Sequence, residues 1–194
     1  VPLRGRVAGR QRADRRRLAR CERELELHRS LRPGAAGVQS GRRDGDRARA
    51  ALTVLLDLTE TTTARFRFHD GKNIIGALAG ILDGQIKWDA GNIEGAAEAF
   101  RRATRYYDSL NYDEPEPLPF SPRHWLGAAY LALGAYDAAL AEYELDMDDH
   151  PNNVWSLHGA TTAMQKLGRD TKEIETKLDS AMQFADVWLL DSRL

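Results

Sequence analysis

The residues that could perform chemistry in this chain are few, and their spacing matches no familiar catalytic arrangement. Five histidines are present, and no two of them stand four residues apart, the spacing that places two imidazoles on one helix face for a metal ion. They are His28, His69, His124, His150 and His158. The chain has no glycine-rich phosphate loop, zinc-ligand spacing or nucleophile elbow. Its single cysteine, Cys21, excludes an internal disulfide framework and a multi-cysteine metal site. The sequence therefore predicts no enzyme, no cofactor and no bound metal.

Two further groups could bind a ligand, but their spacing favours a structural role. An acidic run comprises Asp146, Asp148 and Asp149. It lacks the loop glycine and the later bidentate glutamate of a calcium loop, so we expect a solvated helix end. The second group is Tyr106, Tyr107 and Trp188, which could form a ligand box. At helical spacing such residues more often belong to a core, and we expect a core here.

The elements that must position these residues are helical from about residue 73 to residue 190. Small and large side chains alternate between Ser121 and Pro151 in a way that suits two antiparallel helices. Helices approach to about 8–10 Å only where small side chains meet large ones. Gly127 and Ala139 provide the room, and Tyr130 and Tyr143 fill it. Gly134 supplies the turn between the two helices.

The same arrangement recurs along the chain. Gly134 and Gly168 are 34 residues apart, and Gly91 marks a similar turn upstream. The longer interval from Gly91 to Gly134 is explained by residues 111–119, where three prolines exclude a helix. We expect helices near 73–89, 93–109, 122–133, 137–149, 154–167 and 171–185, stacked in antiparallel pairs.

This pattern resembles the tetratricopeptide-repeat (TPR) family, and within it a group known mainly as uncharacterised sequences. The residues that carry the resemblance, over about 110 positions, are Pro122, Arg123, Leu126 to Ala128, His150 to Gly159, and Ala185 to Val187. The resemblance implies an all-α fold in which helix pairs stack as a short TPR solenoid of about three repeats. It implies no settled activity.

The first quarter of the chain differs in composition from the rest. Residues 1–50 carry 15 arginines, no lysine and 6 acids, a net charge of +9, whereas the remainder has a net charge of −10. We interpret residues 1–47 as a basic arm. It is disordered, a targeting peptide or a product of a wrong reading frame. Nucleic-acid binding by the arm is disfavoured, because no aromatic residue precedes Phe66 to provide a stacking platform. The chain begins with Val1, so we expect a fragment or a processed product.

Residues 48–72 form the edge of the expected array, and residues 73–194 form the TPR domain. Ala48 to Leu58 predicts one apolar helix, and Asp70-Gly71 predicts a turn. The first repeat presents an apolar stripe of Ile74, Ile75, Leu78 and Ile81. We expect Ala48 to Phe68, or further repeats, to cover this stripe, and self-association is possible through it.

The concave surface of such an array is lined by the first helix of each pair. Its candidate residues here are Gln85, Trp88, His124, Ala128, Leu131, Trp155, His158, Thr162 and Gln165. Packing between neighbouring units is an equally good interpretation for Trp88 and Trp155. The two histidines are more often surface hydrogen-bonding residues than ligands. The basic and amide residues that clamp a chaperone carboxylate in some TPR domains are missing, so that partner is disfavoured.

The sequence predicts a scaffold or adaptor that binds a peptide or helix of a partner protein in this groove. The alternative is a structural subunit held in a larger complex through its convex face and tail. No segment is long and apolar enough to span a membrane. We expect a cytoplasmic or another reducing compartment, and import into an organelle stays open.

Overall fold

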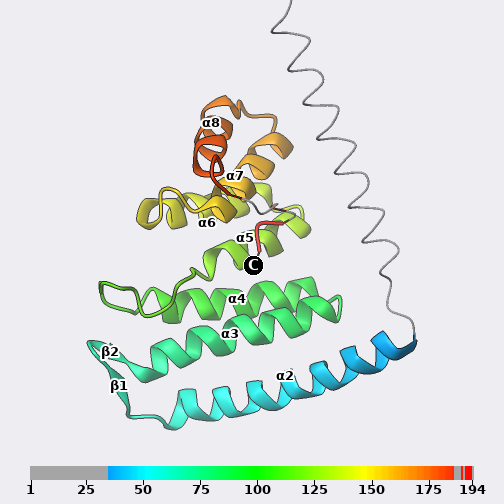
Figure 1. Cartoon of the computed structure of the whole chain (residues 1–194), viewed down its shortest axis with the longest axis vertical. Helices are drawn as coiled ribbons and strands as arrows, with labels where there is room; N and C mark the ends of the chain where they lie inside the picture. Colours follow the sequence, from blue (N-terminus) through cyan, green and yellow to red (C-terminus); the bar gives the residue numbers. More distant parts are fainter. Residues whose placement is uncertain (1–34, 186–188, 190, 194) are drawn as a thin grey trace, which may run out of the picture. The chain divides into compact units, whose positions relative to one another are not determined.

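The computed structural model describes residues 35–185, 189 and 191–193, and within this part the chain is mostly helical (Figure 1). The elements are α2 (Ala35–Thr61), β1 (Arg65–Phe66), β2 (His69–Asp70), α3 (Gly71–Asp89), α4 (Ile93–Tyr107), α5 (Arg123–Ala132), α6 (Tyr136–Asp149), α7 (Val154–Lys166) and α8 (Lys172–Ala181). Helices α3 to α8 match the six predicted helices to within a few residues, and each packs against the next. Residues 1–34 of the arm predicted over 1–47, Trp188, and the last two residues of the motif at 185–187 lie outside the described residues. Residues 35–47 of that arm belong to helix α2, so the prediction of disorder is wrong for them.

The three predicted turn glycines end the first helix of each pair. Gly91, Gly134 and Gly168 have positive φ angles of 78°, 74° and 69°. In each case the main chain closes the helix with the same two hydrogen bonds. At the second turn the Gly134 N–H donates to the Leu131 carbonyl and the Ala135 N–H to the Tyr130 carbonyl. This is the Schellman arrangement, which favours glycine at the left-handed position.

Close contact between α3 and α4 depends on three glycines spaced four residues apart. Gly76, Gly80 and Gly84 form one face of α3, and Figure 1 shows α4 lying alongside it. A Cβ atom built on Gly84 would lie 2.2 Å from the Phe100 ring. The predicted small position at Gly84 is therefore filled by an aromatic ring from α4.

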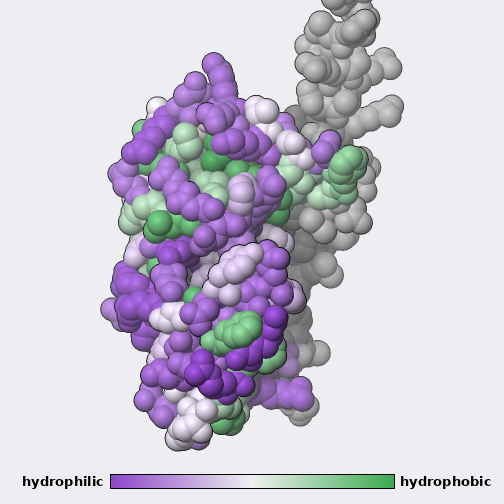
Figure 2. All heavy atoms as spheres, turned by 90° about the vertical axis from the view of Figure 1, so that its left-hand side faces the viewer, coloured by the Kyte–Doolittle hydropathy of each residue, from purple (hydrophilic) through white to green (hydrophobic). Residues whose placement is uncertain are grey.

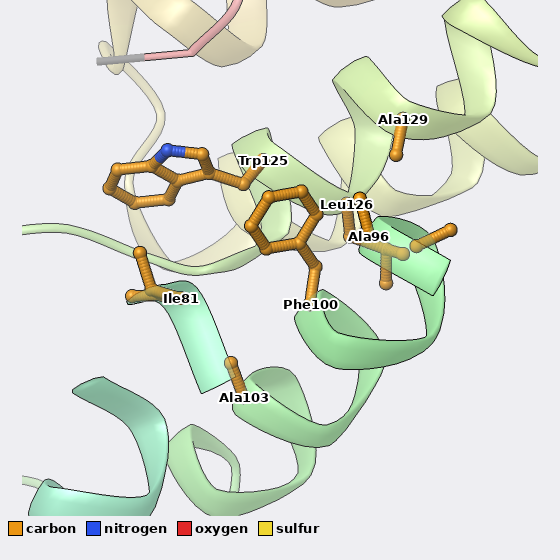
Figure 3. Packing of buried hydrophobic residues seen from close by; sticks show 8 residues of the cluster. Ile81, Ala96, Phe100, Ala103, Trp125, Leu126 and Ala129 are labelled. Atoms are coloured by element: carbon orange, nitrogen blue, oxygen red, sulfur yellow. The ribbon is translucent and has the colours of Figure 1, made fainter. Parts of the chain in front are cut away.

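The first core cluster joins α3, α4 and α5 around that ring. Figure 3 shows Phe100 between Ile81 and Trp125 on one side and Leu126 on the other. Phe100 is fully buried, and Trp125 and Leu126 are 3% and 1% exposed. Arg123 adds a clamp at this junction, because its guanidinium lies 2.7 Å from both Asp108 and Glu142. The start of α5 is thereby fixed to the end of α4 and to α6.

The second core cluster joins α6 and α7 around Tyr143. This ring is fully buried, and Cβ atoms built on Gly127 and Gly159 would lie 2.5 and 2.2 Å from it. Gly127 thus provides the room that the sequence predicts for Tyr143. Ala139, also fully buried, belongs to the same cluster. Tyr130 is only half-buried, and its hydroxyl accepts a hydrogen bond from Arg101.

The hairpin of β1 and β2 is fastened to the loop after α4. His69 is buried, and its Nε2 lies 3.2 Å from Oδ2 of Asp113. Arg67 places Nη2 3.0 Å from the other oxygen of that carboxylate. The buried charge of Asp113 is thus paired, as burial requires. The turn predicted at Asp70-Gly71 is wrong: the chain turns at Arg67 and Phe68, and α3 begins at Gly71.

Helix α2 is longer than the apolar segment predicted over 48–58. It begins at Ala35 and continues to Thr61, where the threonine hydroxyls bond to carbonyls one turn earlier, as Thr59 does to Leu55. Contacts within the chain divide it into two units, with the boundary between Asp44 and Gly45. Leu52, Leu55 and Thr59 form a partly covered face of this helix. Phe66 and Phe68 are 54% and 61% exposed, so these two residues do not cover the apolar stripe of α3.

Candidate functional site

An open hollow of about 780 Å³ lies where α5 and α7 begin. Its walls come from the two loops that precede these helices and from the first turns of both helices. Phe120 precedes α5, His124 lies in its first turn, and Trp155 lies in the first turn of α7. Glu116 and His150 stand on the loops opposite. The hollow has the size of a small-ligand pocket or of a pocket for one or two peptide side chains.

The aromatic side chains of the hollow are stacked on one another. The His124 ring lies 4.4 Å from the Trp125 ring at an angle of 29°, and its centre is 6.1 Å from that of Trp155. Phe120 meets Trp125 edge to face at 5.5 Å. Such offset and edge contacts are the favourable aromatic geometries. The stack fixes the walls of the hollow before any ligand arrives.

His124 is a buried polar side chain that lacks a partner. It is 1% exposed, and neither ring nitrogen forms a hydrogen bond with the described residues. Burial lowers the pKa of His124 to about 4, although the Asp146 carboxylate and the Ser192 main chain oppose that shift. The ring is therefore neutral at pH 7, and it offers one N–H donor and one nitrogen acceptor.

The prediction that Asp146 belongs to a solvated helix end is wrong. Asp148 and Asp149 are exposed, but Asp146 is 1% exposed and faces the start of α7. Its Oδ2 accepts hydrogen bonds from Asn153 at 2.8 Å and from Ser156 at 2.5 Å. The charge thus lies at the positive end of the α7 dipole, where an anion is stabilising. Asp146 thereby positions the first turn of α7, which carries Trp155, and its Oδ2 is occupied by these two bonds.

His150 links this buried carboxylate to the rim of the hollow. Its Nδ1 lies 3.3 Å from Asp146, and its Nε2 lies 3.0 Å from Glu116. Burial alone would lower the pKa of His150, but the contacts with Glu116 and Asp146 raise it. Tyr107 also donates to Glu116, and burial followed by the Glu116 charge raises the Tyr107 pKa. The rim next to the aromatic wall is therefore rich in acceptor oxygens.

A second part of the site lies along the same helices, where the end of the described chain folds back. Ser192 is 2% exposed, and its hydroxyl lies 2.5 Å from that of Tyr143. The Arg193 guanidinium lies 4.0 Å from the centre of the Trp88 ring. Burial lowers the pKa of His158, and the nearby Asp191 opposes that shift. Residues 191–193 therefore touch or approach the predicted Trp88, His124 and His158. We call the surface that bears Trp88, His124, Trp155 and His158 the inner surface.

The other predicted groove residues take different places. Ala128 is 3% exposed and is not open to a partner, and Leu131 is half-buried and packs against the cluster around Tyr143. Thr162 donates to the His158 carbonyl within α7. Gln165 donates to Glu175 of α8 and is exposed. Gln85 is half-buried. The structure thus brings together four of the nine predicted residues.

Sequence reasoning did not find Phe120, Glu116, His150, Ser192 or Arg193 as site residues. They stand on loops and on the tail, outside the helical periodicity that guided the prediction. The one available signal was the aromatic and proline content around Pro119 and Phe120, directly before the helix that carries His124. Within residues 35–185 and the described tail positions, no three metal-ligating side chains come together.

Comparison with known proteins does not extend this description. The chain matches no family model, no curated protein and no solved structure. No helix in the described part is long and apolar enough to cross a membrane.

Proposed function

We propose that this chain is a TPR-type interaction domain that holds an extended segment of a partner protein along its inner surface. The observation that carries the proposal is the aromatic hollow with the unpartnered His124 in its wall. The 34-residue interval from Gly134 to Gly168, which is the TPR period, and the repeated turn geometry support stacked repeats. The resemblance to the TPR family rests on residues alone, because the comparisons gave no match.

The hollow suits a peptide better than a reacting small molecule. A peptide amide offers a donor and an acceptor, and neutral His124 offers the complementary pair. A buried polar group without a partner costs about 1–3 kcal/mol, and a bound main chain would recover part of that. Trp155 and Phe120 provide an aromatic wall for an apolar side chain of the partner. Glu116 on the rim favours a basic residue next to it.

The alternative role, a structural subunit held through its outer face and tail, has less support. Within α3 to α8 and their loops, the large exposed apolar residues are dispersed, since Leu133 follows α5, Leu145 lies on α6 and Phe184 follows α8. Others gather at the N-terminal edge, with Val54, Leu56 and Leu58 on α2 and Phe66 and Phe68 on the hairpin. On the face shown in Figure 2, hydrophobic surface forms separate patches among hydrophilic residues. Ser192 and Arg193 are already packed on the inner surface, so this part of the tail is not presented to a complex.

The proposal is tested by selecting peptides from a random 12-residue phage library on the purified full chain. Affinities of selected peptides are then measured by calorimetry for the parent, Trp155→Ala and Leu145→Ala. Leu145 is 48% exposed on α6 and serves as the matched control. We expect Trp155→Ala to weaken binding at least about tenfold, which is about 1.4 kcal/mol, and Leu145→Ala to leave it unchanged. Failure to select any peptide, or equal affinity for both variants, would contradict the proposal.

A further inference from the structure

The tail residues 191–193 lie on the inner surface in the manner of a bound segment. Ser192 reaches the hydroxyl of Tyr143 from α6, and Arg193 covers the Trp88 ring of α3. Asp191 lies near His158 of α7, and the Ser192 main chain lies near His124 of α5. Three consecutive residues thus span all three helix pairs.

The position of Ser192 is a narrow slot with a polar end. The Tyr143 hydroxyl is reached there because Gly127 and Gly159 carry no side chain, and a Cβ on either would overlap the ring. Tyr143 itself is fully buried, so its hydroxyl depends on a hydrogen bond from an inserted group. Ser192 is 2% exposed in this position. A small hydroxyl side chain fits such a slot, whereas a larger one would displace the Tyr143 ring.

The position of Arg193 on the inner surface is defined by a flat aromatic face. Its guanidinium lies 4.0 Å from the centre of the Trp88 ring, within the range of a cation–π contact. Its Nε donates to Asp191 at 2.8 Å, which holds the guanidinium over the indole. Planar stacking of this kind favours arginine over lysine. The two adjacent positions together distinguish a hydroxyl residue followed by arginine.

We propose that this slot recognises a partner segment in which serine or threonine precedes arginine, and that residues 191–193 occupy the slot when that segment is absent. This inference rests on the proposed function. It identifies the two partner residues that lie against Tyr143 and Trp88, beside the aromatic hollow. The tail keeps the slot filled through one hydroxyl contact and one cation–π contact. A segment that supplies both contacts and also enters the aromatic hollow makes more contacts than the tail and displaces it.

Charge supports an arginine-bearing partner over an acidic one. Residues 51–194 carry 13 basic and 23 acidic side chains, a net charge of −10. Along the inner surface, Glu116 adds local negative charge beside the aromatic rings. A basic segment is therefore attracted, and an acidic one is repelled.

The test uses the full chain and a fluorescein-labelled synthetic peptide with the sequence of residues 183–194. A matched peptide carries valine for Ser192 and glutamate for Arg193. In the full chain, the tail competes with the peptide for the slot at an effective concentration of about millimolar, because it is tethered. Combining Ser192→Ala with Arg193→Ala weakens the binding of the tail to the slot and so reduces this competition. We expect this double variant to bind the labelled peptide at least about tenfold more tightly than the parent, by fluorescence anisotropy. We expect the matched peptide to bind neither protein measurably.

A further substitution identifies the slot. Tyr143→Phe, added to the double variant, removes the hydroxyl and keeps the buried ring, so the chain stays folded. It should weaken peptide binding at least about threefold, and Trp88→Ala should weaken it more. Equal binding to the parent and the double variant, or equal binding of both peptides, would overturn the inference. Peptides selected for the hollow depend on Trp155 and not on the Tyr143 hydroxyl. If these peptides bind but the tail peptide does not, only this inference fails. If no peptide binds at the hollow, the proposed function fails.

Discussion

Replacing Gly159 by alanine adds one methyl group at the most crowded point between α6 and α7. The new Cβ would lie 2.2 Å from Cζ and 2.6 Å from Cε1 of Tyr143, whereas ordinary contacts begin at about 3.4 Å. The ring has little room to retreat, because Gly127 approaches it as closely and Ser192 holds its hydroxyl. The substitution therefore requires a shift of roughly 1 Å in a fully buried side chain.

Two opposing effects set the expected change in the free energy of unfolding. Overpacking of a core costs about 1–3 kcal/mol, and an overlap of this size belongs near the upper limit. Alanine is favoured over glycine inside a helix by about 1 kcal/mol. We expect Gly159→Ala to lower the free energy of unfolding by about 2 kcal/mol in urea titrations followed by circular dichroism. Tyr143→Leu should relieve most of that loss in the double variant, because the overlapping ring is removed.

Gly45→Ala is the matched control for this prediction. Gly45 also lies in a helix, but an added Cβ would meet only Nη1 of Arg49, at 3.6 Å. The same chemical change should therefore leave stability unchanged or raise it slightly. If Gly159→Ala were as stable as Gly45→Ala, or if the effects at positions 159 and 143 were simply additive, the packing argument would be refuted.

Two further predictions concern acid stability and the N-terminal edge of the helix pairs. His124 has a pKa of about 4 in the folded chain, below the ordinary 6.5. The unfolded chain therefore binds more protons between these values, and up to about 3 kcal/mol of stability, fully present above pH 6.5, should be lost as the pH falls to 4. His124→Asn should flatten this part of the urea-midpoint profile; an unchanged profile would contradict the assignment. Removing residues 1–47 should leave the urea midpoint unchanged. Removing residues 1–72 should lower it, because the hairpin contact between His69 and Asp113 is lost. Equal midpoints for the chains 48–194 and 73–194 would show that the first helix pair needs no cover.

The helix pairs could be predicted because their signals are local. The three turn glycines, the glycine at position 127 and the tyrosine at 143 act within one pair or on the next helix, so their spacing identifies them. The tail contact joins residues 143 and 192, and the hairpin contact joins residues 69 and 113. No period links such distant positions. The buried state of Asp146 was missed although its partners are close in sequence, because Asn153 and Ser156 reach it only when the chain folds back at the start of α7.

The residues of the candidate site that lie on helices could be predicted from the sequence, whereas those on loops and on the tail could not. Repeat register found Trp88, His124, Trp155 and His158, which share one surface as first-helix residues. It could not tell which first-helix residues are covered by neighbours, so Ala128 and Leu131 were included although they pack inward. Loop residues such as Phe120 become part of the site only when the chain fold brings them beside α7.

His124 joins the two parts of the inner surface, and this has a consequence for binding. The Ser192 main chain approaches the ring near the tail slot, and the hollow begins at the same ring. A segment that enters the hollow therefore contacts the His124 ring, and the Ser192 main chain no longer lies beside that ring once the tail has left. The neutral ring offers one donor and one acceptor nitrogen, and neither forms a hydrogen bond with the described residues. The tail slot and the hollow therefore border the same imidazole, so a partner segment that fills both must pass His124, where the two ring nitrogens are left for its main chain.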